Sequence, residues 1–153
     1  MTELNSLYNA IAFGTVLTAL DKMGVNPSLV ARQASRVLAP MMKELGKQIS
    51  TQTDAKNLKE FISSWDKIME TAQFADPKGT EASVSNNTLY MKLTNCMFND
   101  MANFGKSQGY PACPICIVNL MVISFIGAQG IGEVADSKVE NKENVCKLKV
   151  SVD

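Results

Sequence analysis

An apolar run from Ile115 to Ile126 constrains the fold of this chain more than any other stretch of its sequence. The glycine-rich stretch GAQGIG, from Gly127 to Gly132, follows it directly. A membrane-spanning helix needs roughly 20 apolar residues, so the run is too short to cross a bilayer. Its length and the glycines behind it predict a buried core helix that begins at Cys113 or Pro114 and ends within the glycine-rich stretch.

Helical periodicity dominates the first 75 residues. It predicts a first helix from Leu4 to Met23, and a second that opens at Asn26 and Pro27 and is kinked or split near Pro40. A third helix is expected to open at Asp54. Its apolar residues recur at the i, i+3, i+4, i+7 spacing of one helix face: Leu58, Phe61, Ile62, Trp65, Ile68 and Met69.

The pattern changes to strands after residue 80. Asn86-Asn87 separates two β-like runs, which predicts a hairpin, and a connector with one short helix leads to the apolar run. A second hairpin is expected to turn at Asn141 to Asn144 and to end in the strand Val145 to Val152. This order predicts one α+β domain over residues 1–153, mainly helical over 1–75, with a small antiparallel sheet, the buried helix and all four cysteines over 80–153.

Charge and composition narrow the classes of function. The chain has 15 basic and 15 acidic residues, so it lacks the positive excess that draws a protein to a phosphate backbone, and we expect no nucleic-acid binding by this chain alone. It has no histidine, which removes the commonest general base and every imidazole metal site. No pair of carboxylates stands out for acid-base catalysis, so we name no catalytic residue and expect a protein that is not an enzyme. The N-terminus does not resemble a secretory signal, which indicates a cytoplasmic protein.

The four cysteines are the candidate site: Cys96, Cys113, Cys116 and Cys146. Cys113 and Cys116 form a C-x-x-C pair that can chelate one ion, and two strand-associated cysteines could complete a tetrahedral thiolate set for zinc or for an iron-sulfur cluster. The tetrapeptide CPIC also resembles a glutaredoxin active site, although the strand that should precede it is missing. A third interpretation is that all four are ordinary buried thiols.

Four segments of the C-terminal half carry a resemblance to a known family. A strand ends in NCMF, a loop leads to CPIC, an apolar helix closes on glycines, and a hairpin ends in CKLKV. Together, over roughly Thr88 to Val152, they resemble the vinyl-reductase-like, or hydrocarbon-binding, small-molecule-sensing domain, which is distantly related to transport-particle tethering subunits. The helical first half carries no motif of that family.

The resemblance implies an α+β fold with an apolar cavity between helices and sheet, and a zinc site at the start of the long helix and in the final hairpin. The helix-start ligand falls on Cys113 or Cys116 and the final-strand ligand on Cys146. The family's other hairpin cysteine falls on Lys138 here, so either a carboxylate such as Glu140 or Glu143 replaces it, or Cys96 and the second cysteine of the pair complete the set. We favour Cys96, because a set of thiolates makes a more uniform site.

The sequence therefore predicts a sensor or binding domain for a small apolar or amphipathic ligand, with a cysteine-bound structural metal and no membrane span. One alternative is a thiol-disulfide or iron-sulfur redox protein that uses the CPIC motif. Another is a structural assembly subunit that forms a homodimer through its helices.

Overall fold

The computed structural model describes residues 15–16, 19–20, 22–48, 55–72, 77–110, 112–113 and 116–153. The predicted first helix falls largely outside these residues. The helices with described bounds are α2 (Pro27–Gln48), α3 (Leu58–Ala72), the 3-10 helix η1 (Pro77–Gly79), α4 (Asn99–Ser107) and α5 (Ile117–Gln129). The strands are β1 (Thr80–Ser85), β2 (Thr88–Thr94), β3 (Val134–Lys142) and β4 (Val145–Val152). None of the described helices is long and apolar enough to span a bilayer.

The four strands form one antiparallel sheet in the order β1-β2-β4-β3, with β2 and β4 at its centre. Two tight turns close its hairpins. Asn86 and Asn87, with φ of 48° and 55°, join β1 to β2, and Glu143 and Asn144, with φ of 52° and 63°, join β3 to β4. Positive φ at both central residues belongs to the type I′ turn, which matches the twist of the strands. The first hairpin is confirmed, and the second turn is two residues long, so Asn141 belongs to β3.

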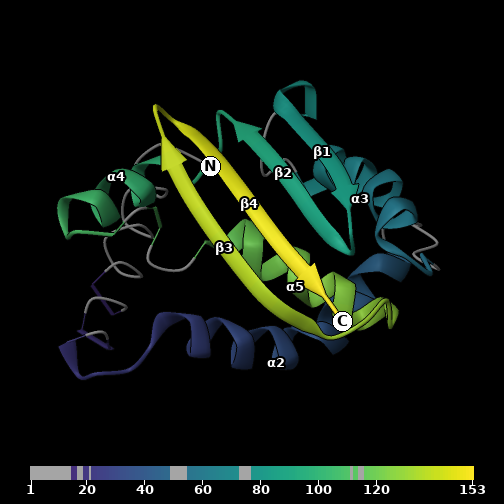
Figure 1. Cartoon of the computed structure of the whole chain (residues 1–153), viewed down its shortest axis with the longest axis horizontal. Helices are drawn as coiled ribbons and strands as arrows, with labels where there is room; N and C mark the ends of the chain where they lie inside the picture. The colour runs from purple at the N-terminus through teal and green to yellow at the C-terminus, as the bar shows by residue number, and fades with distance from the viewer. Residues whose placement is uncertain are drawn as a thin grey trace.

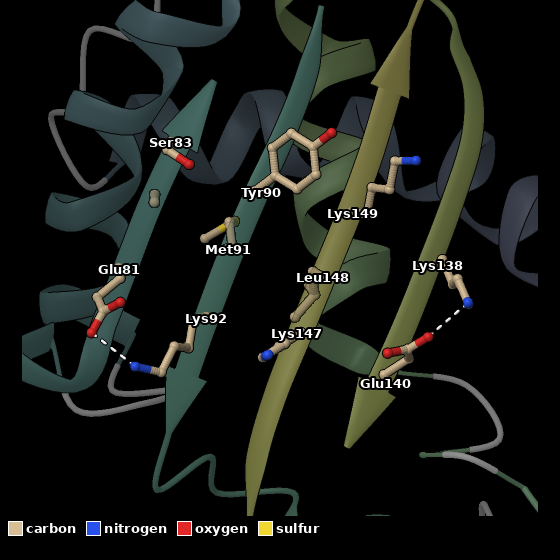
Figure 2. A pocket seen from close by; sticks show the side chains of 11 residues that line it. Glu81, Ser83, Tyr90, Met91, Lys92, Lys138, Glu140, Lys147, Leu148 and Lys149 are labelled. Carbon is tan, nitrogen blue, oxygen red and sulfur yellow. Dashed lines mark hydrogen bonds and ion pairs between the residues drawn. The ribbon is translucent and has the colours of Figure 1, made fainter. Parts of the chain in front are cut away.

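Helices cover one face of the sheet. Figure 1 shows α5 passing behind the central strands and α2 lying beyond it, while α3 lies behind β1. The side chains that face α5 alternate along the strands and are buried: Leu89, Met91, Leu93, Cys146, Leu148, Val150 and Val152. The intervening side chains alternate with these and point to the opposite face (Figure 2), which no described helix covers (Figure 1). The predicted α+β class, with helices packed on a small antiparallel sheet, is confirmed.

Both helices predicted between residues 26 and 75 are present, with two differences. Pro40 lies inside α2, and the helix continues on both sides of it, so the predicted split is absent. Pro40 is exposed, and the contacts of α2 with α5 outweigh the one helical hydrogen bond that proline cannot form. The third helix begins at Leu58 because Asn57 caps it: the Asn57 Oδ1 atom accepts the N–H groups of Lys59 and Glu60, both at 3.0 Å.

The buried central helix is also present, but it begins later than predicted. α5 starts at Ile117 with Cys116 as its N-cap, instead of at Cys113 or Pro114. The Cys116 sulfur accepts the N–H of Asn119 at 3.4 Å, so this side chain caps one of the free N–H groups in the first turn of α5. At the other end, Gly130 adopts φ 67° as a left-handed C-cap, within the predicted glycine-rich stretch.

Candidate thiol site

The four cysteines gather at the end of the sheet where β2 finishes and β4 begins. Cys146 lies in β4 opposite Leu93, and Cys96 follows β2 after a sharp bend at Asn95, whose φ is 54°. Cys113 and Cys116 lie on the segment that enters α5. All four are free; Cys96, Cys116 and Cys146 are buried and Cys113 is half-buried. We call this set the thiol cluster.

Cys96 and Cys146 are in direct contact at the centre of the cluster. The Cys96 thiol donates to the Cys146 sulfur, which raises the pKa of Cys96 and lowers that of Cys146. Asn141, opposite Cys146 in the sheet, adds a second donor, its Nδ2 atom lying 3.1 Å from the Cys146 sulfur. The thiol of the pair that ionises more readily is therefore Cys146 on β4, because a charge-assisted hydrogen bond stabilises the anion that accepts it.

The C-x-x-C pair lies within electrostatic range of Cys146. Burial raises the pKa of the Cys116 thiol to about 11, and the backbone N–H groups of Asn119 and Val118 partly offset that rise. Burial is also the main reason why the pKa of Cys113 is raised, and negative charge on Cys116 or Cys146 raises it further. The Cys113 thiol donates to the Phe98 carbonyl oxygen at 3.7 Å, so one peptide carbonyl links this segment to the bend after β2.

Three of the four sulfurs accept N–H hydrogen bonds. The Phe98 N–H donates to Cys96, the two N–H groups at the start of α5 donate to Cys116, and the Asn141 amide donates to Cys146. Hydrogen bonds of this kind stabilise thiolate ligands and tune the metal that they bind. The ammonium of Lys106 in α4 acts in the same direction, since it lowers the pKa of both Cys113 and Cys146. These donors and Lys106 offset burial only in part: the pKa of Cys96, Cys113 and Cys116 is still raised, and only that of Cys146 is lowered.

The described sulfurs are not arranged as a metal site. Within the described part of the chain, no three cysteine, aspartate or glutamate side chains are placed so that they could hold a metal ion together. As it stands, the geometry is that of a thiol pair with two further thiols close by.

The carboxylates considered as replacement ligands lie apart from the cluster. Glu140 points to the uncovered face of the sheet, where its Oε1 atom lies 2.6 Å from the Lys138 ammonium. Glu143 is exposed in the turn between β3 and β4. The structure thus brings Cys96 to the other three cysteines and leaves Lys138, Glu140 and Glu143 outside.

Two residues of this site were not foreseen from the sequence. Asn141 was assigned to a turn, although a two-residue turn at 143–144 would have placed it on the same face as Cys146 by simple alternation. Lys106 gives no local signal, because only the packing of α4 brings its charge towards the cluster. The backbone of Phe98 interacts with two of the cysteines, Cys96 and Cys113.

The site and fold define an α+β domain with a buried cluster of four thiols. No family model, curated protein or solved structure matches the chain.

Proposed function

We propose that this protein is a non-enzymatic binding or sensor domain for a small amphipathic ligand, whose C-terminal half is held together by a zinc ion on the thiol cluster. The observation that carries the proposal is the meeting of four thiols from three separate elements at one end of the sheet. It agrees with the resemblance to the vinyl-reductase-like domain. The ion would tie the end of β2, the start of β4 and the start of α5 to one another.

The balance of charge supports a cation in the cluster. The N–H donors around Cys96, Cys116 and Cys146 favour thiolates, while burial and the mutual repulsion of the sulfurs oppose more than one negative charge. A divalent cation removes that conflict, because it neutralises the sulfurs that the donors already stabilise. An all-sulfur set suits zinc, and the same four ligands would accept an iron-sulfur cluster.

The ligand has a candidate site in the groove between α2 and the end of α5. This groove of about 500 Å³ has buried Ile123 at its base and Arg32 and Arg36 at its rim. Arg32 donates to the Ala135 carbonyl oxygen at 3.3 Å, which holds α2 against β3. Two guanidinium groups outnumber the one carboxylate of the lining, Glu133, so the groove suits an apolar molecule that carries one acidic group. A ligand placed there would shift the packing of α2 against the rest of the domain.

Metal analysis tests the proposal directly. Protein purified without oxygen should contain one zinc per chain and no visible absorption band, and Cys146→Ser should lose the metal. Val145→Ser is the matched control, since it introduces the same residue at the adjacent, half-buried position of β4 and should keep the metal. Chelation should lower the midpoint of urea unfolding in the wild type and leave it unchanged in Cys146→Ser. The zinc site would be refuted if the wild-type protein contained no metal, or if wild type and Cys146→Ser contained equal amounts of zinc.

The direct contact between Cys96 and Cys146 favours a redox protein as the second candidate function. Two adjacent thiols, one with a lowered pKa, can close to a disulfide when a low-molecular-weight disulfide accepts the two electrons and the protons. The sequence pointed to Cys113 and Cys116 for this role. Metal-free protein with a reversible disulfide would support the redox function, and mass spectrometry of alkylated peptides would identify the pair.

The exposed apolar face of α2 favours a homodimer. Leu29, Val37 and Met41 succeed one another along this helix and are 54%, 72% and 61% exposed. A second copy is a natural occupant of such a stripe, because two α2 helices could pack through it. Light scattering after gel filtration should report a dimer for the wild type and a monomer for Val37→Glu. Monomeric wild type would refute the dimer.

A further inference from the structure

The uncovered face of the sheet has a hollow with an unusual arrangement of charge. The hollow measures about 590 Å³ and extends over all four strands. Figure 2 shows the phenol ring of Tyr90 at one side of this hollow, between β2 and β4 and on the side of β2 that faces Lys149. Tyr90 is 42% exposed. The hollow lies on the other side of the sheet from the thiol cluster.

The strand register sorts these side chains into two rows across the sheet. One row has the order Ser83, Tyr90, Lys149, Lys138, and the other has the order Glu81, Lys92, Lys147, Glu140. Each row therefore places two lysines directly opposite one another on neighbouring strands. Like charges in this position destabilise a sheet, so the face holds two unfavourable pairs whose repulsion an anion would relieve.

The carboxylates on this face are already engaged at its two sides. Glu81 pairs with Lys92 at 3.0 Å, and Glu140 pairs with Lys138 at 2.6 Å, as the dashed lines in Figure 2 show. The second pair raises the pKa of Lys138 and lowers that of Glu140. Among the described residues, Lys147 and Lys149 form no ion pair within 4 Å, although Lys147 lies opposite Glu140 and its charge contributes to the lowered pKa of that carboxyl. The four lysines and two glutamates of the hollow leave an excess of two positive charges on the central strand β4.

We infer that this face binds a nucleoside monophosphate, with the phosphate between Lys147 and Lys149 and the planar base against Tyr90. A phosphate monoester carries about −1.5 to −2 charges near neutral pH, which matches the excess of two positive charges. Lysine is a common phosphate ligand, and bases stack on exposed aromatic rings. The Ser83 hydroxyl, at the far side of Tyr90, can hydrogen-bond to the base or the ribose.

A small ligand fits this face better than a nucleic-acid strand or an acidic protein. The positive excess is confined to one hollow on a chain whose charges balance overall at 15 each, so there is no basic track for a series of phosphates. Tyr90 is the one aromatic side chain among the residues that line the hollow, so there is a platform for one base. The hollow also has the volume of a small-molecule site, which falls between about 300 and 1,000 Å³.

Nuclear magnetic resonance titration of the full chain with adenosine monophosphate tests the inference. The amide signals of Tyr90, Lys147 and Lys149 should shift, inorganic phosphate should bind more weakly, and adenosine should bind most weakly. Lys149→Gln should weaken binding roughly two- to fivefold, whereas Lys142→Gln, a charge removal on the same face outside the hollow, should not. Tyr90→Leu should weaken binding at least about fivefold, to near the affinity for inorganic phosphate.

Each other result would overturn the inference. Absence of shifts at millimolar adenosine monophosphate would remove the site. Equal losses in Lys149→Gln and Lys142→Gln would mean diffuse attraction, and unchanged binding in Tyr90→Leu would remove the stacking. A single-stranded oligonucleotide or a glutamate-rich peptide that shifts these amides when the mononucleotide does not would assign the face to a macromolecule instead.

Discussion

Gly132 lies in the connection between α5 and β3, at a point where the backbone passes close to the end of β4. A methyl group added at this position would approach the Asp153 carbonyl oxygen to 2.7 Å and would come closer still to the Cγ1 atom of Val152. Ordinary contacts of a Cβ atom are 3.4 Å or longer, so both neighbours would have to move. We therefore predict that Gly132→Ala destabilises the fold.

The structure sets the size of this effect. Val152 is buried, and the N–H of Asp153 donates to the Glu133 carbonyl oxygen at 3.0 Å, so a shift of the β4 end disturbs both packing and a hydrogen bond. Overpacking costs about 1–3 kcal/mol and a net hydrogen bond about 1 kcal/mol. The free energy of unfolding should fall by roughly 2–4 kcal/mol, and the melting temperature by roughly 5–12 °C for a chain of this length.

Gly127→Ala is the matched control, because it makes the same chemical change in the same region. Gly127 is exposed in α5, and a Cβ there would meet no atom within 4 Å. Its replacement should raise the stability by roughly 0.4–1 kcal/mol, since alanine loses less backbone entropy in a helix. Urea unfolding followed by circular dichroism measures both variants. Changes of the same sign in the two variants would refute the argument that close packing at Gly132 decides the outcome.

Three further predictions concern the helix cap and the thiols. Asn57→Ala should lower the free energy of unfolding by about 1 kcal/mol through loss of the α3 cap, whereas Asn103→Ala, at an exposed position of α4, should not lower it; urea unfolding compares them. In metal-free protein the raised pKa of Cys116 should contribute to the free energy of unfolding below about pH 8.5, the pKa of the unfolded thiol, and this contribution should be lost as the pH rises towards about 11, the pKa in the folded protein. The loss of stability at high pH should be smaller in Cys116→Ala, and equal losses in the two proteins would exclude this thiol as the cause. Asn141→Leu should raise the pKa of Cys146 by removing an N–H donor, and an unchanged thiolate absorption titration would show that the donor is unimportant.

Most elements could be predicted because their signals are local. The apolar spacing around Trp65, the Asn86-Asn87 turn and the glycines after Ile126 depend only on neighbours in sequence, and each marks an element that is present. The boundaries that differ depend on tertiary contacts. Pro40 is accommodated because α2 packs on α5, and α5 begins late because Cys116 caps it with its own sulfur. Helix propensity reports neither effect.

The candidate site was predictable in its members but not in its arrangement. Four cysteines without a histidine identify the residues, and the strand order then brings Cys96 next to Cys146. Which sulfur accepts a hydrogen bond depends on the register that places Asn141 opposite Cys146. The two rows of charge on the uncovered face depend on the same register. Alternation along each strand was visible in the sequence, but the pairing between strands was not.

The strand order β1-β2-β4-β3 has a consequence for how the chain folds during synthesis. The central strand β4 is the last of the four to leave the ribosome, so the edge of β2 that pairs with β4 stays unpaired until β4 has been synthesised. Cys96 leaves well before its partner Cys146, and α5 emerges before the face that it covers is complete. The contacts that define this domain are distant in sequence, which predicts slow folding that is completed only after β4 has been released.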